Sequence, residues 1–294
     1  MNDVPVLFFE GVVSHTTRKE TLLAGRTLSG LAGHFASEAY VKRCRHTMLL
    51  RNGQLEEESY FNCENQRVYI GTKLSRKHLH YTGLVIRADE EEYGTDPKAM
   101  ERVLSATKGK HVLLCLETPN ISEEIAECVE SIRFVYELQV DTEITSLVLK
   151  MLRLLVEKNT LTSIQINEDV DIEVETAQLL ADLLKQKQFH RLYLHGKYIA
   201  ALKDIIASWK ENSEEMVGKM IYCREEFSKL QLSSTEFPFQ ECTEEEERKA
   251  KRAYLVSANW SYITRISVLR NQDGRAVYCF SRSSLVFKSV FVFV

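Results

Sequence analysis

One short pattern of apolar positions returns six times between residues 81 and 232: apolar-x-x-apolar-x-apolar. The six copies are Tyr81-Leu84-Ile86, His111-Leu114-Leu116, Val135-Leu138-Val140, Leu161-Ile164-Ile166, Phe189-Leu192-Leu194 and Phe227-Leu230-Leu232. His111 is the only first member that is not apolar. The last two apolar positions of each copy lie two residues apart, which is the spacing of a strand with one buried face. The pattern therefore predicts six strands.

The stretches between the copies have the apolar spacing of helices. From Ile144 to Leu155, positions 144, 147, 148, 151, 154 and 155 are all apolar, which marks one face of an α-helix. Asp96-Pro97 supplies an N-cap followed by proline in the first turn of an earlier helix. Since helices connect the predicted strands, we expect the strands to be parallel neighbours in one sheet.

The repeat is irregular in its period. The first members of the final pairs stand 24 to 38 residues apart, at positions 84, 114, 138, 164, 192 and 230. Periods of about 20–29 residues with the pattern L-x-x-L-x-L are typical of leucine-rich repeats, whose neighbouring units bury each other's open faces. The Asn or Cys that normally follows is missing from every copy. We therefore expect an α/β fold with an irregular leucine-rich-repeat-like βα array over residues 47–235; a run of unrelated βα units is the alternative.

Residues 47–80, at the start of this array, have a less regular pattern. Thr47 to Leu50 and Arg67 to Ile70 are predicted strands, and Glu56-Glu57-Glu58 is predicted to be a solvated turn between them.

The pattern changes again over residues 236–294. Glu244 to Arg252 carries opposite charges four residues apart, which predicts an exposed helix. Asp273-Gly274 then separates two apolar runs, and this is a strong signal for a β-hairpin. Ser284 to Val294 offers a third strand. We expect this region to be a charged helix followed by antiparallel strands.

Residues 3–46 have the pattern of a small helical unit. Pro5 suits a first helical turn, a second helix carries Leu22 and Leu23, and a third runs from His34 to Arg43. A helical unit of this size is close to the lower limit for a core that folds alone. It is expected to need a partner or a neighbouring domain.

This N-terminal segment resembles an F-box. The matching positions are Pro5, Leu7, Val12, Val13, Ser14, Glu20, Leu22 and Leu23. Two positions depart from the motif: His15 stands where the family usually has Leu, and no Trp follows Leu28. F-box proteins commonly combine this motif with a leucine-rich βα array. The chain is similar in particular to the divergent, greatly expanded F-box families of nematodes.

The resemblance implies a non-catalytic substrate-recognition subunit of a Skp–cullin–F-box type ubiquitin ligase. In that interpretation the N-terminal helices dock on a Skp-type adaptor of the cullin complex, and the array binds a target protein through residues that the sequence does not identify. The implied adaptor-binding residues are Pro5, Leu7, Val12, Val13, Leu22 and Leu23. The alternative is a protein-binding solenoid scaffold with no link to ubiquitin, in which the N-terminal helices only cap the first strand.

Charge and cysteine usage narrow the class of partner. The net charge is −4 with both signs interspersed, which indicates neither a nucleic-acid nor a membrane partner. The seven cysteines are odd in number and never form C-x-x-C, which favours reduced thiols inside a cell. The opening apolar run is too short for a signal peptide, and no stretch approaches the length of a membrane span. We expect a cytoplasmic or nuclear protein.

The common catalytic and metal-binding motifs are missing from the sequence. It contains no G-x-S-x-G, no G-x-x-x-x-G-K-[ST] and no G-x-G-x-x-G. The pairs His78/His80 and His190/His195 lack the H-E-x-x-H frame of a zinc site. We therefore expect no catalytic residues, no metal and no cofactor, and we interpret the chain as a binding protein.

Overall fold

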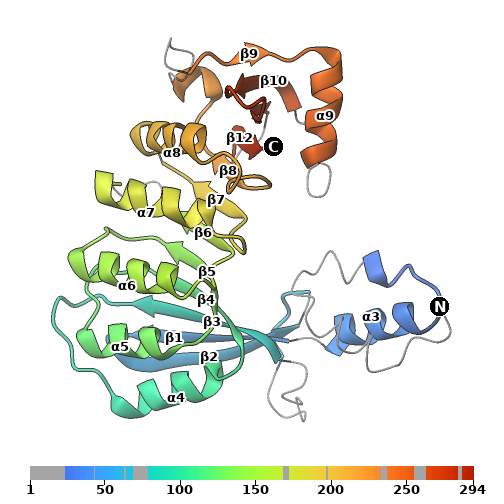
Figure 1. The fold of residues 1–294 in the computed structure, drawn as a ribbon. Helices are drawn as coiled ribbons and strands as arrows, with labels where there is room; N and C mark the ends of the chain where they lie inside the picture. Colours follow the sequence, from blue (N-terminus) through green and yellow to red (C-terminus); the bar gives the residue numbers. More distant parts are fainter. Residues whose placement is uncertain are drawn as a thin grey trace. The chain divides into compact units, whose positions relative to one another are not determined.

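The computed structural model describes residues 24–42, 44–62, 64–68, 79–167, 172–196, 198–230, 232, 237–254, 263–283 and 287–294. Over these residues the chain is mixed α/β, with seven α-helices and twelve strands (Figure 1). The predicted α/β class is confirmed. The chain divides into two compact units: the first comprises Met1–Cys115 and Ser122–Val135, and the second comprises Leu116–Ile121 and Tyr136–Val294.

The first unit is built on strands in the order β2-β1-β3-β4. Their bounds, with those of the unit's helices, are β1 (Cys44–Arg51), β2 (Gln54–Asn62), β3 (Leu79–Arg87), β4 (His111–Leu116), α3 (Gly30–Lys42), α4 (Pro97–Thr107) and α5 (Glu123–Ser131). β1 pairs antiparallel with β2 and parallel with β3. Helix α4 begins as predicted, because the side chain of Asp96 accepts a hydrogen bond from the Lys98 N–H and Pro97 takes the first turn.

The hairpin between β1 and β2 corrects two expectations for residues 47–80. Glu56, Glu57 and Glu58 lie inside β2, and the turn is Asn52-Gly53, whose φ angles are 47° and 70°. Two consecutive positive φ values suit a two-residue hairpin loop, for which Asn-Gly is the favoured pair. The strand predicted from Arg67 is absent from the described residues 67 and 68, where Arg67 forms only an isolated bridge to Phe61. Residues 69 and 70 lie outside the described part of the chain.

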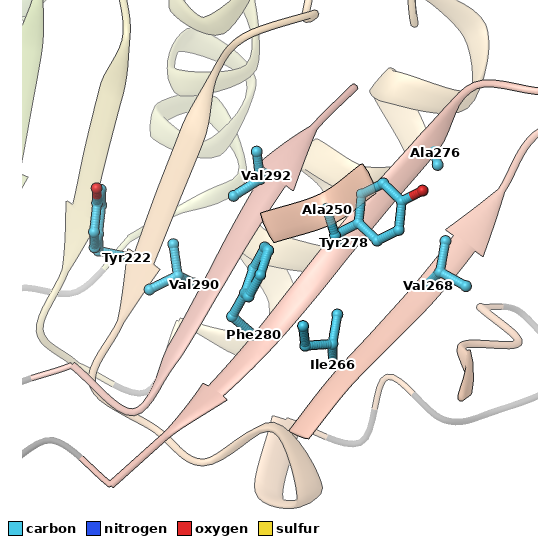
Figure 2. Close-up of a cluster of buried hydrophobic side chains, with 9 residues drawn as sticks. All are labelled: Tyr222, Ala250, Ile266, Val268, Ala276, Tyr278, Phe280, Val290 and Val292. Carbon is cyan, nitrogen blue, oxygen red and sulfur yellow. The ribbon is translucent and has the colours of Figure 1, made fainter. Parts of the chain in front are cut away.

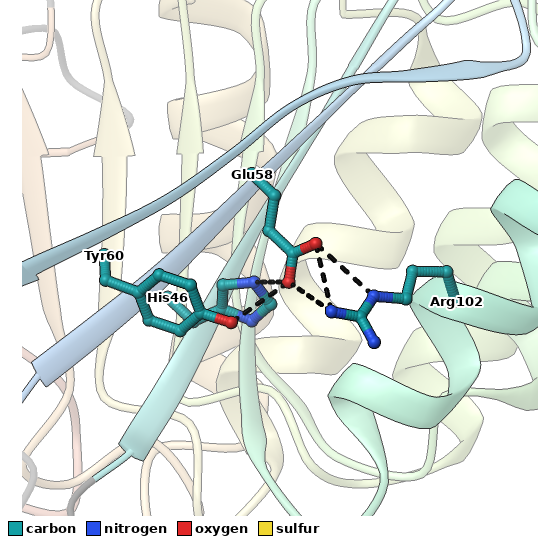
Figure 3. Close-up of polar contacts among 4 residues, drawn as sticks. All are labelled: His46, Glu58, Tyr60 and Arg102. Atoms are coloured by element: carbon teal, nitrogen blue, oxygen red, sulfur yellow. Dashed lines mark hydrogen bonds and ion pairs between the residues drawn. The ribbon is translucent and has the colours of Figure 1, made fainter. Parts of the chain in front are cut away.

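A polar cluster ties the hairpin to α4 (Figure 3). The Glu58 carboxylate lies 2.8 Å from Nε2 of the buried His46, accepts a 3.0 Å hydrogen bond from the Tyr60 hydroxyl, and pairs through both oxygens with Arg102. The rings of His46 and Tyr60 stack at 4.6 Å. Burial opposes the charge on Glu58, yet the Tyr60 hydrogen bond and the nearby His46 and Arg102 hold its pKa below the usual value. We interpret this cluster as an anchor for α4, since Arg102 of this helix pairs with Glu58 of β2, which also contacts His46 of β1.

In the second unit, four parallel strands align in register: β5 (Val135–Val140), β6 (Ser163–Ile166), β7 (Arg191–Leu194) and β8 (Met220–Cys223). One row across them is Leu138, Ile164, Leu192 and Ile221, and a second is Val140, Ile166, Leu194 and Cys223; both rows are buried. The helices α6 (Ser146–Glu157), α7 (Val174–Lys185) and α8 (Ile199–Glu211) lie side by side along one face of these strands (Figure 1).

Five of the six predicted strand segments are confirmed, in β3, β4, β5, β6 and β7. The sixth, at Leu230 and Leu232, is wrong. Leu230 ends the 3₁₀ helix η2 (Phe227–Leu230), and the strand that follows β7 is β8. Phe227 and Leu230 are three residues apart, and this spacing also suits a 3₁₀ turn, in which the side chains at i and i+3 share a face. Leu230 and Leu232 are buried, so the pattern identified core positions but not their backbone conformation.

The rest of the second unit's sheet is antiparallel. β8 pairs with β12 (Ser289–Phe293), and the order continues through β11 (Ala276–Arg282), β10 (Ile263–Arg270) and the short β9 (Gln240–Glu241). The hairpin predicted at Asp273-Gly274 is confirmed between β10 and β11, with a φ of 79° at Gly274. β12 lies between β8 and β11, so both of its edges are paired, and all five of its residues are buried. Burial on both faces explains why residues 290 to 293 are all apolar.

Helix α9 (Glu244–Tyr254) packs against this antiparallel part of the sheet through the buried Ala250 (Figure 2). The cluster around Ala250 comprises Tyr222, Ile266, Val268, Ala276, Tyr278, Phe280, Val290 and Val292. The predicted exposed helix is confirmed, because four glutamates occupy the first turn of α9 and Lys251 pairs with Glu247.

A buried lysine fixes the loop that leads into β7. Lys219 stands immediately before β8 and is 3% exposed. Its ammonium donates to the backbone oxygens of Gln186 at 2.6 Å, Lys187 at 3.2 Å and Phe189 at 2.6 Å. Burial lowers the pKa of Lys219, and the three carbonyls use all three of its N–H donors. The side chain therefore connects the starts of β7 and β8.

Replacing Lys219 by methionine should lower the free energy of unfolding by about 3 kcal/mol. The carbonyls of Lys187 and Phe189 lose the Lys219 donor, and a buried carbonyl left without a donor costs about 1–3 kcal/mol, whereas the Gln186 carbonyl still accepts from the Phe189 N–H. Urea unfolding measures the loss, and the slope of the unfolding free energy against urea concentration should be the same for both proteins. The matched control is the exposed Lys187→Met in the same loop, which should change stability by less than about 0.5 kcal/mol. Equal midpoints for wild type and Lys219→Met would contradict the assigned role.

Candidate functional site

The parallel strands of the second unit have one face that its helices do not cover. Helices α6, α7 and α8 lie along one face of the parallel strands, and α9 packs over the antiparallel strands (Figure 1). Leu138 and Ile164 are buried, so we place their side chains on the face that the helices cover. Alternate residues of β5, β6 and β7 point the other way, and no helix described for this unit lies over them. We call this surface the open face.

Three rows of side chains form the open face, because the register of the strands is continuous. The first row is Glu137, Ser163, Arg191 and Met220, and the second is Gln139, Gln165, Tyr193 and Tyr222. The third is Asp141, Asn167, His195 and Arg224, where backbone N–H groups of the last three donate to Val140, Ile166 and Leu194. In a parallel sheet, partners in register project to the same side at the spacing of the strands. The open face is therefore a grid of mainly polar and aromatic groups, with Met220 at the end of its first row.

Glutamine side chains in the second row are held by the third row. Nε2 of Gln139 donates to Asp141 at 2.7 Å, and Nε2 of Gln165 donates to Asn167 at 3.3 Å. The hydroxyl of Tyr198, at the start of α8, donates to the backbone oxygen of Asn167. These contacts fix the orientation of both amides, so that their carbonyl oxygens have a defined direction on the surface.

Aromatic rings gather at the β7–β8 side of the open face. Tyr193 and Tyr222 stack with their ring centres 4.7 Å apart. Phe287 packs on this pair, with its ring 5.5 Å from Tyr193 and 5.7 Å from Tyr222, and lies 4.7 Å from the ring of His195. Tyr222 also belongs to the buried cluster under α9, so the aromatic group is anchored in the core. Rigid aromatic side chains of this kind are the usual centres of protein interfaces.

Charge on the open face centres on Glu137 and Arg191. Burial raises the pKa of Glu137, and the positive charge of Arg191 only partly offsets that effect. Burial also raises the pKa of Tyr193, again with Arg191 acting in the opposite direction. The guanidinium Nε of Arg191 is buried and has no hydrogen-bond partner among the described residues. The acid, the guanidinium and the phenol therefore form one partly desolvated group.

The side chains of the open face are suited to binding another molecule. They offer oriented amides, a stacked aromatic group, and the partly buried Glu137 under the influence of the Arg191 charge. Arg and Tyr are enriched in protein interfaces, where a polar rim surrounds a few well-packed anchors.

The residues that the resemblance assigns to adaptor binding lie outside the described part of the chain. These are Pro5, Leu7, Val12, Val13, Leu22 and Leu23. Of the three predicted N-terminal helices, the third is confirmed as α3. Leu28 and Leu31, which follow the matched positions, are 58% and 45% exposed.

The open face itself was not identified from the sequence. Its residues fall between the apolar positions of the repeat, so the same alternation that predicted buried Leu138 and Ile164 also pointed to Glu137, Gln139 and Gln165 as their outward neighbours. What the sequence lacked was the register between strands, which decides which outward residues become neighbours. Tyr222 lies in β8, which the repeat pattern did not predict, and Phe287 lies just before β12; neither carried a signal of its own.

Comparison of the chain with protein-family models, curated sequences and solved structures gave no match. Among the described residues, no helix has both the length and the apolar character needed to cross a bilayer. The fold and the open face therefore carry the functional argument.

Glu137→Gln should stabilise the protein near neutral pH. Because the folded-state pKa of Glu137 is raised, the acid favours folding only below its unfolded pKa, and this contribution is lost as pH rises through the folded pKa. The melting temperature of the variant should therefore match wild type at low pH and exceed it as pH rises. Thermal unfolding between about pH 4 and pH 7 measures this.

The control for this series is Glu143→Gln, which replaces an exposed glutamate of the same unit and should leave the pH profile of wild type unchanged. A Glu137→Gln variant that loses stability at neutral pH would show that attraction to Arg191 outweighs the cost of burial.

Proposed function

We propose that this protein is a non-catalytic recognition subunit that binds a target protein on the open face. The observation that carries the proposal is the in-register grid of polar and aromatic side chains on the helix-free side of β5 to β8. Four strands spaced about 4.8 Å apart span about 14 Å, and three rows extend over a similar distance along the strands. An open sheet face of this kind suits a protein surface better than a small ligand, which favours a concave pocket.

The aromatic group supplies the anchor in this proposal. Tyr193 offers its partly exposed ring, while Tyr222 and Phe287 hold that ring in place from behind. A preorganised side chain loses little conformational freedom on binding, so more of the contact energy is retained. Gln139 and Gln165 add hydrogen-bonding groups whose orientation is already fixed.

The link to ubiquitin rests on the F-box resemblance of the N-terminal residues. In that role, Pro5, Leu7, Val12, Val13, Leu22 and Leu23 contact a Skp-type adaptor, and the cullin complex carries the conjugating enzyme. The protein then acts by positioning: it raises the effective concentration of a target lysine near the activated ubiquitin, and it needs no acid or base of its own. The second candidate function is a binding scaffold without the adaptor, which uses the same open face.

Adaptor binding separates these two functions. Full-length protein should bind a Skp-type adaptor in a pull-down and by calorimetry, and the double change Leu22→Ala and Leu23→Ala should abolish detectable binding. Burying a leucine contributes about 1.5–3 kcal/mol, so losing two of them weakens a micromolar contact beyond the range of the assay. Thermal unfolding of the double variant should match wild type, because the leucines face the adaptor rather than the array.

The matched control is Val174→Ala with Val217→Ala, which removes two exposed apolar side chains of the second unit and should leave adaptor binding intact. A wild-type chain that binds no Skp-type adaptor would end the ligase proposal and leave the scaffold. The double leucine variant could also bind poorly and have a lower melting temperature than wild type. That result would favour the alternative in which the N-terminal helices only cap the first strand, because the two leucines would then be part of the folded core.

A further inference from the structure

A groove runs between α9 and the β10–β11 hairpin of the second unit. It has a volume of about 710 Å³. Its helical wall carries Glu245, Arg248, Lys249 and Arg252, which stand at i, i+3, i+4 and i+7 and so share one face of α9. This stretch of helix is about 10 Å long, since a helix rises about 1.5 Å per residue. The opposite wall carries Arg270 and Arg275, and Tyr278 also lines the groove.

The lining of this groove is strongly basic. Five of its side chains are cationic, namely Arg248, Lys249, Arg252, Arg270 and Arg275, and two are acidic, namely Glu245 and Glu246. Arg270 pairs with Glu246, and Arg275 lies 3.7 Å from Glu214. Over the described residues, Lys249 and Arg252 have no ion-pair partner. The chain as a whole carries a net charge of −4, so this concentration of positive charge is local.

We propose that the groove binds an acidic segment of a partner protein, a short extended stretch rich in Asp and Glu. The carboxylates of that segment pair with Lys249 and Arg252 on the helix and with Arg275 on the hairpin. An extended chain advances about 3.3 Å per residue, so the groove holds about three residues. Cations on both walls around an open groove repel one another, and an anionic occupant relieves that repulsion.

Charge distribution favours a peptide over a nucleic acid. A nucleic-acid strand requires positive charge that continues along several phosphates. Here the first turn of α9 carries Glu244, Glu245, Glu246 and Glu247, so the basic surface ends after a short distance. A short acidic stretch fits within the basic part, whereas a phosphate backbone that continued past it would meet these glutamates. The inference does not depend on the proposed ligase function, because it rests only on this groove.

The test is fluorescence anisotropy of the full-length chain with a labelled short polyglutamate peptide. Polyglutamate should bind, a polyglutamine peptide of equal length should not, and added salt should weaken the complex because exposed charges are screened. The double change Lys249→Glu and Arg252→Glu should weaken binding about tenfold or more, since two attractive charges become repulsive.

The matched control is Lys150→Glu with Lys187→Glu, which makes the same change of charge at exposed lysines away from the groove and should leave binding within about twofold of wild type. Absence of polyglutamate binding overturns the proposal. Equal weakening by the control shows attraction to net charge alone and also overturns it. A single-stranded oligothymidylate that binds more tightly than polyglutamate, and loses binding through the same groove residues, would assign the groove to nucleic acid instead.

Discussion

The second unit depends on the register of its four parallel strands. Leu138, Ile164, Leu192 and Ile221 form one buried row, and a shift of any strand by one residue would move its apolar side chains from the helix-covered face to the opposite one. The same register places Glu137, Gln139, Tyr193 and Tyr222 as neighbours on the open face. One geometric constraint therefore specifies both the core and the candidate binding surface.

That register is held at the β7–β8 side by Lys219. Its ammonium binds carbonyls just before β7, while its own backbone leads directly into β8. A buried charge is costly unless its hydrogen bonds are satisfied, so the position tolerates the lysine only when the loop before β7 presents all three carbonyls. This contact supports the register in which Arg191 lies opposite Met220, and Tyr193 opposite Tyr222 follows two residues later.

Sequence periodicity predicted which segments form strands and helices better than it predicted which of these segments lie side by side. Pairs such as Ile164 and Ile166 predicted strands correctly, because alternation and a buried face leave a local signal. Leu230 and Leu232 carried the same signal but belong to a 3₁₀ helix and the segment after it, since burial alone does not fix the backbone. The anchor at Lys219, the contact between Phe287 and Tyr193, and the basic groove join residues far apart in the chain. No local pattern encodes such contacts.

Strand pairing in the second unit changes at β8, which is parallel to β7 and antiparallel to β12. This change affects where binding surfaces can form. From β5 to β8, the connecting helices return the chain to the same end of the sheet and lie on one face, which leaves the open face without a helix over it. Beyond β8, α9 lies in the chain between β9 and β10 and packs on the antiparallel part of the sheet through Ala250, on the side that carries Tyr222. Among the described residues, an accessible hollow forms where α9 meets the edge of the hairpin. The basic groove is such a hollow, which is why its walls combine a helix face with the ends of β10 and β11.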